Sequence, residues 1–233
     1  FDNQSALTVR SAFLQNHEFR LALIDLNRNT ALDERRLVEI GAIDLDGSLF
    51  AINLASLEDK LDALPELTGA EVERELPGTL RVRVVAREPL AWLELPAHQI
   101  AARDLHRGLL VDADAVPFPC TPGFAPTAAD LPVALLDDPG LPAPTPGRPF
   151  PCPELTRVLQ LLMLARNVPG MDEFPIERIE QRNEWSFRLT TRSGVVAQFG
   201  LVDQPRQLAD YVTVCRHARD RDCRLATIDL IPS

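Results

Sequence analysis

The stretch AEVERELPGTLRVRVVAREPLAWL, residues 70–93, decides the fold of the first part of this chain. Glutamates at 71, 73 and 75, and then arginines at 81, 83 and 87, alternate with residues that include Val72, Leu80 and Val82. A period of two residues is typical of a strand with one wet face and one buried face. Proline and glycine between the two runs indicate a turn, so the stretch predicts a β-hairpin.

The charge pattern also predicts the register of this hairpin. A two-residue loop at Pro77-Gly78 would set Glu75 opposite Leu80. A three-residue loop over 77–79 sets Glu75 opposite Arg81 and Glu73 opposite Arg83, with Val72 facing Val84. Matched faces favour the three-residue loop.

The residues before the hairpin predict one strand and two helices. Residues 19–26 form an apolar run of strand length, and residues 27–30 are turn formers. Asp33 can cap a first helix that Gly41 ends. Asn53 can cap a second helix, whose apolar stripe is Leu54, Leu57, Leu61 and Leu64. The predicted order is therefore β-α-α-β-β.

Composition indicates a globular chain of two domains and excludes some partners. The 233 residues exceed the usual size of one domain, and 45% of them are hydrophobic. A formal net charge of −10 argues against nucleic acid or an anionic membrane surface as the main partner. No apolar run approaches the roughly 20 residues that a membrane-spanning helix needs.

A proline-rich segment follows the first domain. Residues 117–153 hold twelve of the twenty prolines, which predicts a long extended insertion. It could be a polyproline ligand for another protein, but a stiff loop that wraps the second domain is the favoured interpretation.

The last third of the chain predicts two helices and several strands. Cys152-Pro153 opens a helix with a buried face of Leu155, Val158, Leu159 and Leu162. Alternation over 185–191 and 195–201 predicts a hairpin, with Gly194 in its turn and with Trp185 on the same side as Phe187. An amphipathic helix around 208–217 and a strand over 225–231 complete an α+β chain.

Several ordered motifs together carry a resemblance to a known family. They are Leu61 to Leu67, Ala70 to Leu80, Arg87 to Trp92, the Leu110-Val111-Asp112-Ala113-Asp114 turn, and the closing order from Trp185 to Leu230. This set resembles the extracytoplasmic region of FtsQ/DivIB family bacterial cell-division proteins. The resemblance implies a membrane-proximal segment over 1–18, a POTRA domain over 19–93, and a mostly antiparallel β domain with packed helices over 94–233.

The resemblance also implies a function and a location. Family members are single-pass inner-membrane proteins with this region in the periplasm, so an N-terminal membrane helix is expected to precede Phe1. They act as scaffolds of the divisome during septum formation and bind FtsB-like and FtsL-like proteins and other divisome components. The expected mechanism is β-augmentation, in which a partner segment adds a strand to an open sheet edge.

The predicted partner-binding residues lie at the end of the chain. The family usually has a further strand after the one resembling Ala226 to Leu230, so residues 225–231 are expected at the edge here. The strand residues are Leu225, Ala226, Thr227, Ile228, Asp229, Leu230 and Ile231, and the preceding helix is expected to add a side wall of Tyr211, Val212 and Arg216. Tyr211 by itself is more typical of a half-buried core residue. In the POTRA domain, the edge near 19–26 or the strand over 81–87 is a weaker candidate.

The four cysteines predict disulfides in an oxidising compartment. Three pairings are possible, and sequence neighbourhood favours Cys215 with Cys223 and Cys120 with Cys152. Scattered cysteines and isolated histidines do not indicate a zinc site.

The sequence gives only weak indications of a catalytic or ion-binding site, and no cofactor is expected. Asp112 and Asp114 could bind a cation or serve as acid and base in an extracytoplasmic hydrolase, but two aspartates after an apolar strand are more typical of a turn. Arg81, Arg83 and Arg87 could bind an anion, although a solvated sheet face is favoured. The alternative to a division scaffold is a POTRA-bearing assembly factor or chaperone for envelope proteins.

Overall fold

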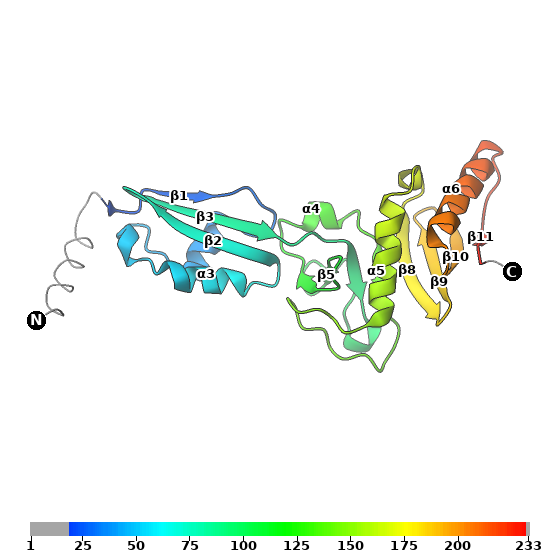
Figure 1. The fold of residues 1–233 in the computed structure, drawn as a ribbon, viewed down its shortest axis with the longest axis horizontal. Helices are drawn as coiled ribbons and strands as arrows, with labels where there is room; N and C mark the ends of the chain where they lie inside the picture. Colours follow the sequence, from blue (N-terminus) through cyan, green and yellow to red (C-terminus); the bar gives the residue numbers. More distant parts are fainter. Residues whose placement is uncertain (1–18, 232–233) are drawn as a thin grey trace, which may run out of the picture. The chain divides into compact units, whose positions relative to one another are not determined.

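The computed structural model describes residues 19–231, and these form two compact units that divide between Arg87 and Glu88 (Figure 1). The segment expected over residues 1–18 lies outside the described residues. The boundary lies a few residues before the expected position after residue 93. The reason is that the strand at Ala91–Glu94 pairs with strands of the second unit.

The first unit has the β-α-α-β-β order that the sequence predicts. Its elements are β1 (Leu23–Leu26), α2 (Glu34–Gly41), the 3-10 turn η2 (Leu49–Ala51), α3 (Leu54–Asp62), β2 (Leu67–Glu75) and β3 (Thr79–Ala86). Asp33 and Asn53 cap the two helices with their side-chain oxygens, as expected. The sheet order is β1-β3-β2, with β1 parallel to β3, and α3 packs against β2 (Figure 1).

The register of the hairpin differs from the prediction by two residues. Glu75 lies opposite Thr79, Glu73 opposite Arg81 and Val72 opposite Val82, so the three loop residues are 76–78. A shift of two keeps every side chain on its face, so alternation alone cannot distinguish the two registers. Gly78 lies close to the backbone of residues 20–23, a contact that the alternation of polar and apolar residues cannot predict. Its carbonyl accepts hydrogen bonds from Ala22 and Leu23.

The second unit is built on one mixed sheet of eight strands. The strands are β4 (Ala91–Glu94), β5 (Leu109–Val111), β6 (Pro117–Pro119), β7 (Val133–Leu135), β8 (Ile176–Asn183), β9 (Ser186–Thr191), β10 (Val196–Gly200) and β11 (Thr227–Asp229). Their order is β11-β10-β9-β8-β7-β4-β5-β6. Four of the neighbouring pairs are antiparallel, whereas β4-β7, β7-β8 and β10-β11 are parallel. The α+β class is confirmed.

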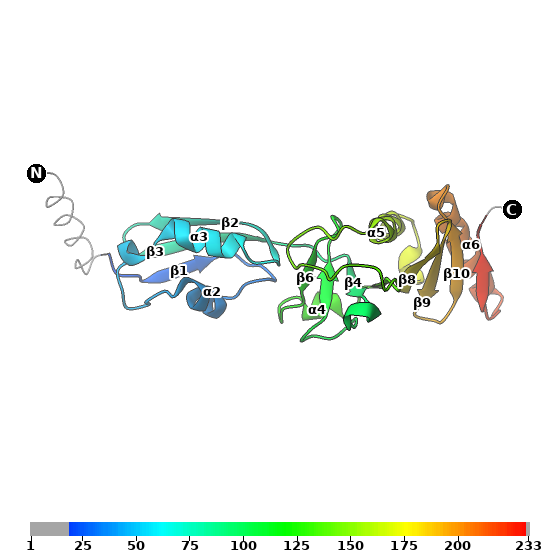
Figure 2. The same cartoon turned by 90° about the horizontal axis from the view of Figure 1, so that it is seen from below.

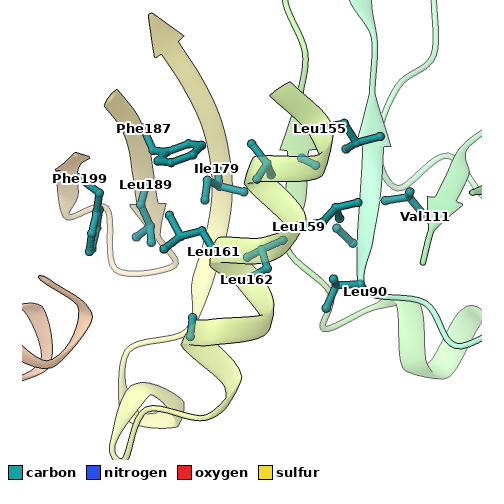
Figure 3. Close-up of a cluster of buried hydrophobic side chains, with 14 of the residues drawn as sticks. Leu90, Val111, Leu155, Leu159, Leu161, Leu162, Ile179, Phe187, Leu189 and Phe199 are labelled. Carbon is teal, nitrogen blue, oxygen red and sulfur yellow. The ribbon is translucent and has the colours of Figure 1, made fainter. Parts of the chain in front are cut away.

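The helices of this unit cover the sheet. They are η3 (Pro96–His98), α4 (Ala125–Ala128), α5 (Pro153–Arg166), η4 (Met171–Glu173) and α6 (Gln204–Asp220). α5 packs on β7 and β8, α6 packs on β10, and the two helices touch each other. The predicted buried face of α5 is confirmed for Leu155, Val158, Leu159 and Leu162, and Figure 3 shows this helix against the strands.

The proline-rich segment is not the long extended insertion that its composition predicts. It contains β6, α4 and β7, and β7 lies inside the sheet between β4 and β8. The run 131–136 has one proline at its start, which leaves Val133 to Leu135 free to pair. α4 covers the face of β4 opposite α5 (Figure 2), where Trp92 donates to the Ala128 carbonyl at 2.7 Å. The segment therefore wraps the domain and also contributes to its sheet.

The β9-β10 hairpin is confirmed, with one error at its start. Phe187, Leu189 and Ala197 are fully buried, as the alternation predicts. Trp185 is 69% exposed, because it lies in the β8-β9 turn, where its amide donates to the Asn183 side chain. The strand begins one residue later, at Ser186.

Candidate partner-binding site

The strand β11 forms one edge of the large sheet within the described residues. It pairs in parallel with β10, with Thr227, Ile228 and Asp229 opposite residues 196–198. The Val196 amide donates to Ala226, and the Leu230 amide donates to Gln198. Because peptide groups alternate along a strand, those of Thr227 and Asp229 face away from β10. Backbone amide and carbonyl groups that face outward in this way can pair with another extended segment.

The paired part of this segment is shorter than the predicted strand over 225–231. Ile228 is buried and belongs to the core, whereas Thr227 and Asp229 are exposed. Leu225 and Leu230 are partly buried against the core, and Ala226 and Ile231 are exposed. The Asp229 carboxylate accepts from the Ile231 amide at 3.0 Å, which turns the chain at the end of the strand.

The predicted side wall on α6 is not available as a surface. Tyr211 is fully buried and Val212 is 3% exposed, so both pack in the core instead of facing a partner. Tyr211 is therefore more buried than the half-buried residue expected from the sequence. Helical spacing identifies the apolar face of α6, but it does not show that the sheet already covers that face.

Arg216, the third predicted wall residue, is held in an ion cluster. Arg216 and Arg219 both bind the Glu173 carboxylate, and the Arg219 contact measures 2.7 Å. Hydrogen bonds from Arg216 and then Arg219 lower the pKa of Glu173. A Cβ atom on Gly170, which has φ of +85°, would lie 2.0 Å from the Arg216 side chain, so glycine leaves room for the cluster.

A pocket that no sequence pattern predicts opens beside the same helix. Its volume is about 610 Å³. We call it the α6 pocket, and its lining residues are Glu173, Phe174, Pro175, Arg192, Ser193, Val195, Tyr211, Cys215, Ala218, Arg219, Cys223, Arg224 and Leu225. These residues come from four separate segments of the chain, so no local sequence motif predicts the pocket.

Neither of the expected disulfides is formed. All four cysteines are free, with Cys120, Cys152 and Cys215 buried and Cys223 exposed. The Cys152 thiol accepts from the Leu155 amide and so caps α5. Burial raises the pKa of these three buried thiols, which keeps them protonated and unreactive.

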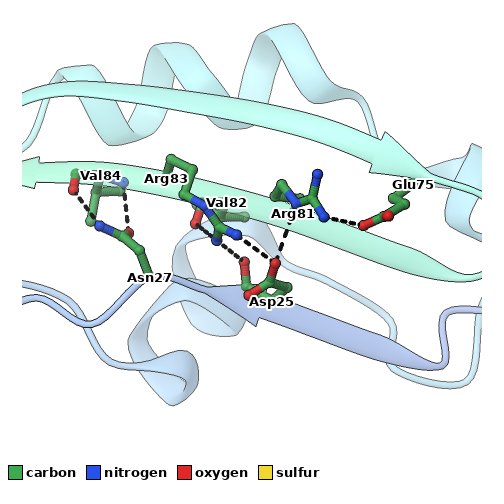
Figure 4. Close-up of polar contacts among 7 residues, drawn as sticks. All are labelled: Asp25, Asn27, Glu75, Arg81, Val82, Arg83 and Val84. Atoms are coloured by element: carbon green, nitrogen blue, oxygen red, sulfur yellow. Dashed lines mark hydrogen bonds and ion pairs between the residues drawn. The ribbon is translucent and has the colours of Figure 1, made fainter.

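The arginine-rich face of the first unit is neutralised. Figure 4 shows Arg81 and Arg83 converging on Asp25, with contacts of 3.3 and 2.6 Å, while Arg81 also reaches Glu75. The hydrogen bond from Arg83 lowers the pKa of Asp25. Arg87 donates to the carbonyls of Pro65 and Leu67. This arrangement fits the favoured interpretation of a solvated face.

The Asp112 motif forms a turn. Its carboxylate accepts from the amides of Asp114 and Val116, and Ala115 adopts φ of +58°. Among residues 19–231, no group of three or more histidine, cysteine or acidic residues could hold a metal ion. Within the same range, no helix has both the length and the apolar character needed to cross a bilayer.

Comparison with known proteins places the first unit in a defined class. Residues 19–87 match the model of the POTRA domain, FtsQ-type. These are the described residues of the first compact unit, so this part of the chain is an FtsQ-type POTRA domain.

A known protein is also similar to this chain. The chain is similar to the cell division protein FtsQ of Novosphingobium aromaticivorans, with 29% identity over 86 residues. The match covers 37% of this chain and 27% of that protein. The resemblance to the FtsQ/DivIB family that the sequence carries is thereby confirmed.

Proposed function

We propose that this chain is a non-enzymatic scaffold of the FtsQ/DivIB type in bacterial cell division. It binds FtsB-like and FtsL-like proteins during septum formation. The FtsQ-type POTRA domain and the similarity to FtsQ support this proposal over an assembly factor for envelope proteins. By the same resemblance, the full-length protein is a single-pass inner-membrane protein with this region in the periplasm. Protease added to spheroplasts should then degrade this region, and full protection would contradict that topology.

The open edge at β11 is the observation that supports β-augmentation. The peptide groups of Thr227 and Asp229 face away from β10, so a partner segment could add a ninth strand to the sheet. Each ladder hydrogen bond contributes about 0.5–1.5 kcal/mol. Ile228 faces the core, and its amide faces β10. Substitutions at Thr227 or Asp229, whose backbone groups face outward, therefore test whether a partner pairs with the edge.

The experiment is a Thr227→Pro variant, measured for binding to the extracytoplasmic segments of FtsB-like and FtsL-like proteins by calorimetry. Proline removes the outward amide donor, and edge strands tolerate proline when that donor does not face the sheet. We expect binding at least about tenfold weaker than that of the unsubstituted chain, because one bond is lost and the ring obstructs the partner backbone.

Thr227→Val is the matched control, because it keeps the amide and the β-branched shape. We expect its affinity to stay within about twofold of the original. Thermal unfolding of both variants should match that of the original chain. Unchanged binding by Thr227→Pro would move the interface away from β11, and no binding of the unsubstituted chain at tens of micromolar would refute this site.

A further inference from the structure

A second pocket of the second unit opens at the C-terminal end of α5. Its volume is about 500 Å³, and we call it the α5 pocket. It is lined by residues 165–172 at the helix end and by residues next to the starts of β4, β7 and β8. Of the residues that the structure describes, none on α6 or β11 lines it. The α5 pocket is therefore separate from the candidate edge.

The floor of this pocket is apolar. Leu90, Leu162, Ala165 and Met171 line it, and each is more than nine-tenths buried. All four belong to the apolar core of the unit, so packing holds the floor in place. Val168 also lines the pocket and is partly buried against the same core. A preformed apolar floor in a pocket of this size can bind the hydrocarbon part of a small ligand.

The end of α5 gives one side of the pocket a partial negative charge. This helix is 14 residues long, and its last carbonyl groups lack partners within the helix. Asn167 satisfies two of them, because its amide donates to Leu164 and its side chain donates to Met163. The dipole of the helix remains, and it favours a cation at this end.

The charged side chains at the rim leave a negative charge. Asp130 pairs with Arg192 at 3.0 Å, and Arg166 lies 4.0 Å from Glu88, so each of these rim residues has an opposite charge beside it. Asp172 is exposed and has no ion-pair partner among residues 19–231. The charge of Asp172 has the same sign as the end of the helix, so both attract a cation.

Two arginines near Asp172 do not cancel its charge. Arg216 binds Glu173, while Arg219 pairs with Glu173 at 2.7 Å and lies 4.0 Å from Asp220. These two cations therefore face two other carboxylates, and the charge of Asp172 is not neutralised.

From the apolar floor, the helix end and the acidic rim, we propose that the α5 pocket binds a small organic cation, an alkyl chain with a terminal ammonium group. The alkyl chain lies over Leu162 and Met171, and the ammonium group donates to the carboxylate of Asp172. A neutral ligand lacks this charge-assisted bond, and an anionic ligand meets a charge of its own sign. Binding here does not require strand addition at β11, so it stands or fails independently of the proposed edge.

The test uses three probes with the same chain of carbon atoms and different charge. Hexylammonium is the cation, hexan-1-ol the neutral counterpart and hexanoate the anion. Each is titrated into the ¹⁵N-labelled chain while the amide resonances of residues 165–168 and 170–172 are followed. We expect these resonances to shift with hexylammonium at millimolar concentration. Hexan-1-ol should bind about fivefold more weakly and hexanoate more weakly still, and added salt should reduce the differences.

An ammonium group on an alkyl chain occurs both in free amines and in the lysine side chains of peptides. Nα-Acetyl-lysine amide separates these two sources, because its peptide groups must also fit at the mouth of the pocket. Weaker binding than that of hexylammonium would support a free amine. Tighter binding would overturn the free amine in favour of a lysine side chain.

Two variants test the named contacts. Asp172→Asn should bind hexylammonium about threefold more weakly and should leave the affinity for hexan-1-ol unchanged. Asp137→Asn is the matched control, because Asp137 is exposed in the same unit and does not line the pocket. It should leave both affinities unchanged. Val168→Trp places a larger side chain in the pocket and should weaken both probes about tenfold or more, with thermal unfolding used to show that the fold is kept.

The outcomes separate the parts of the proposal. Equal affinity for hexylammonium and hexanoate would overturn the preference for a cation. Unchanged binding of hexylammonium by Asp172→Asn would overturn the carboxylate contact. Resonances that do not move at millimolar hexylammonium would overturn the site itself. Thr227→Pro should bind hexylammonium like the original chain, so failure of the edge and failure of the pocket remain distinguishable.

Discussion

The POTRA domain and the second unit are stabilised in different ways. The first unit has a small sheet whose outer face is covered by ion pairs, such as those from Asp25 to Arg81 and Arg83. The second has an apolar cluster to which β strands, α5 and α6 all contribute. Figure 3 shows the part of this cluster around α5. In the first unit, ion pairs on the sheet surface add to elements that form mainly from local sequence signals. In the second, long-range apolar packing joins strands that are distant in sequence.

The largest expected effect comes from this apolar cluster. Leu161 on α5 is fully buried and lies near Leu189 (Figure 3). Leu161→Ala should lower the free energy of unfolding of the second unit by about 2–5 kcal/mol, because it removes buried apolar atoms and leaves a cavity. Amide hydrogen exchange read separately over 88–231 and 19–87 measures this, and protection should fall only in the second unit.

Leu164→Ala on the same helix is the control. Leu164 is 37% exposed, so we expect a loss below about 1 kcal/mol. Equal loss of protection in both units after Leu161→Ala would mean that they unfold together, and the comparison between them would fail.

A smaller effect is expected from a buried charge in the POTRA domain. Glu66 is fully buried immediately before β2, and its carboxylate pairs with Arg36 on α2. Arg36→Ala would leave that carboxylate buried without a counter-charge. We expect the free energy of unfolding of the first unit to fall by about 1–3 kcal/mol, discounted because the arginine side chain is one-third exposed.

The neighbouring arginine gives the control. Arg35 pairs with Glu39 one helical turn away, but both side chains are well exposed. Arg35→Ala should change stability by about 0.5 kcal/mol or less in denaturant unfolding. If the two variants behaved alike, burial of Glu66 would not be the source of the effect.

The same contrast explains how much of the fold the sequence could predict. In the POTRA domain, the caps at Asp33 and Asn53 and the alternation around Pro77 are local signals, and the element order follows from them. The predicted hairpin register was wrong, because a pattern that repeats every two residues is unchanged when the pairing shifts by two residues. In the second unit, the sequence did not predict β7, which lies in a proline-rich segment. Its pairing with β4 and β8 depends on residues some 40 positions away on either side.

The candidate site shows the same limit. The last strand was expected over 225–231, but only three of its residues pair, because Asp229 turns the chain at the end of the strand. The family resemblance led us to expect Tyr211 and Val212 as wall residues, although both are buried in the core. Arg192 and Arg224 meet at the α6 pocket from segments 32 positions apart, and nothing near either residue predicts that meeting.

The smallest effect concerns the ion pairs on the POTRA sheet and depends on pH. Hydrogen bonds from Arg83 and Arg81 lower the pKa of Asp25 below its ordinary value of 3.8 (Figure 4). A carboxyl with a lowered folded-state pKa contributes stability that is complete above the unfolded-state value and is lost as pH falls through the lowered value. Asp25→Asn should therefore be less stable than the original chain at pH 7, and the difference between the two should be smaller at pH 2.

Denaturant midpoints of the first unit at both pH values measure this convergence. Asp59→Asn, on the exposed side of α3, makes the same chemical change away from any ion pair in the described residues, and its midpoint should follow the original chain at both pH values. Because the Asp25 cluster is half open to solvent, salt should also narrow the difference at pH 7. A gap that stayed constant from pH 7 to pH 2 would mean that Asp25 acts through its shape and hydrogen bonds and not through its charge. The POTRA sheet would then depend on packing, as the second unit does.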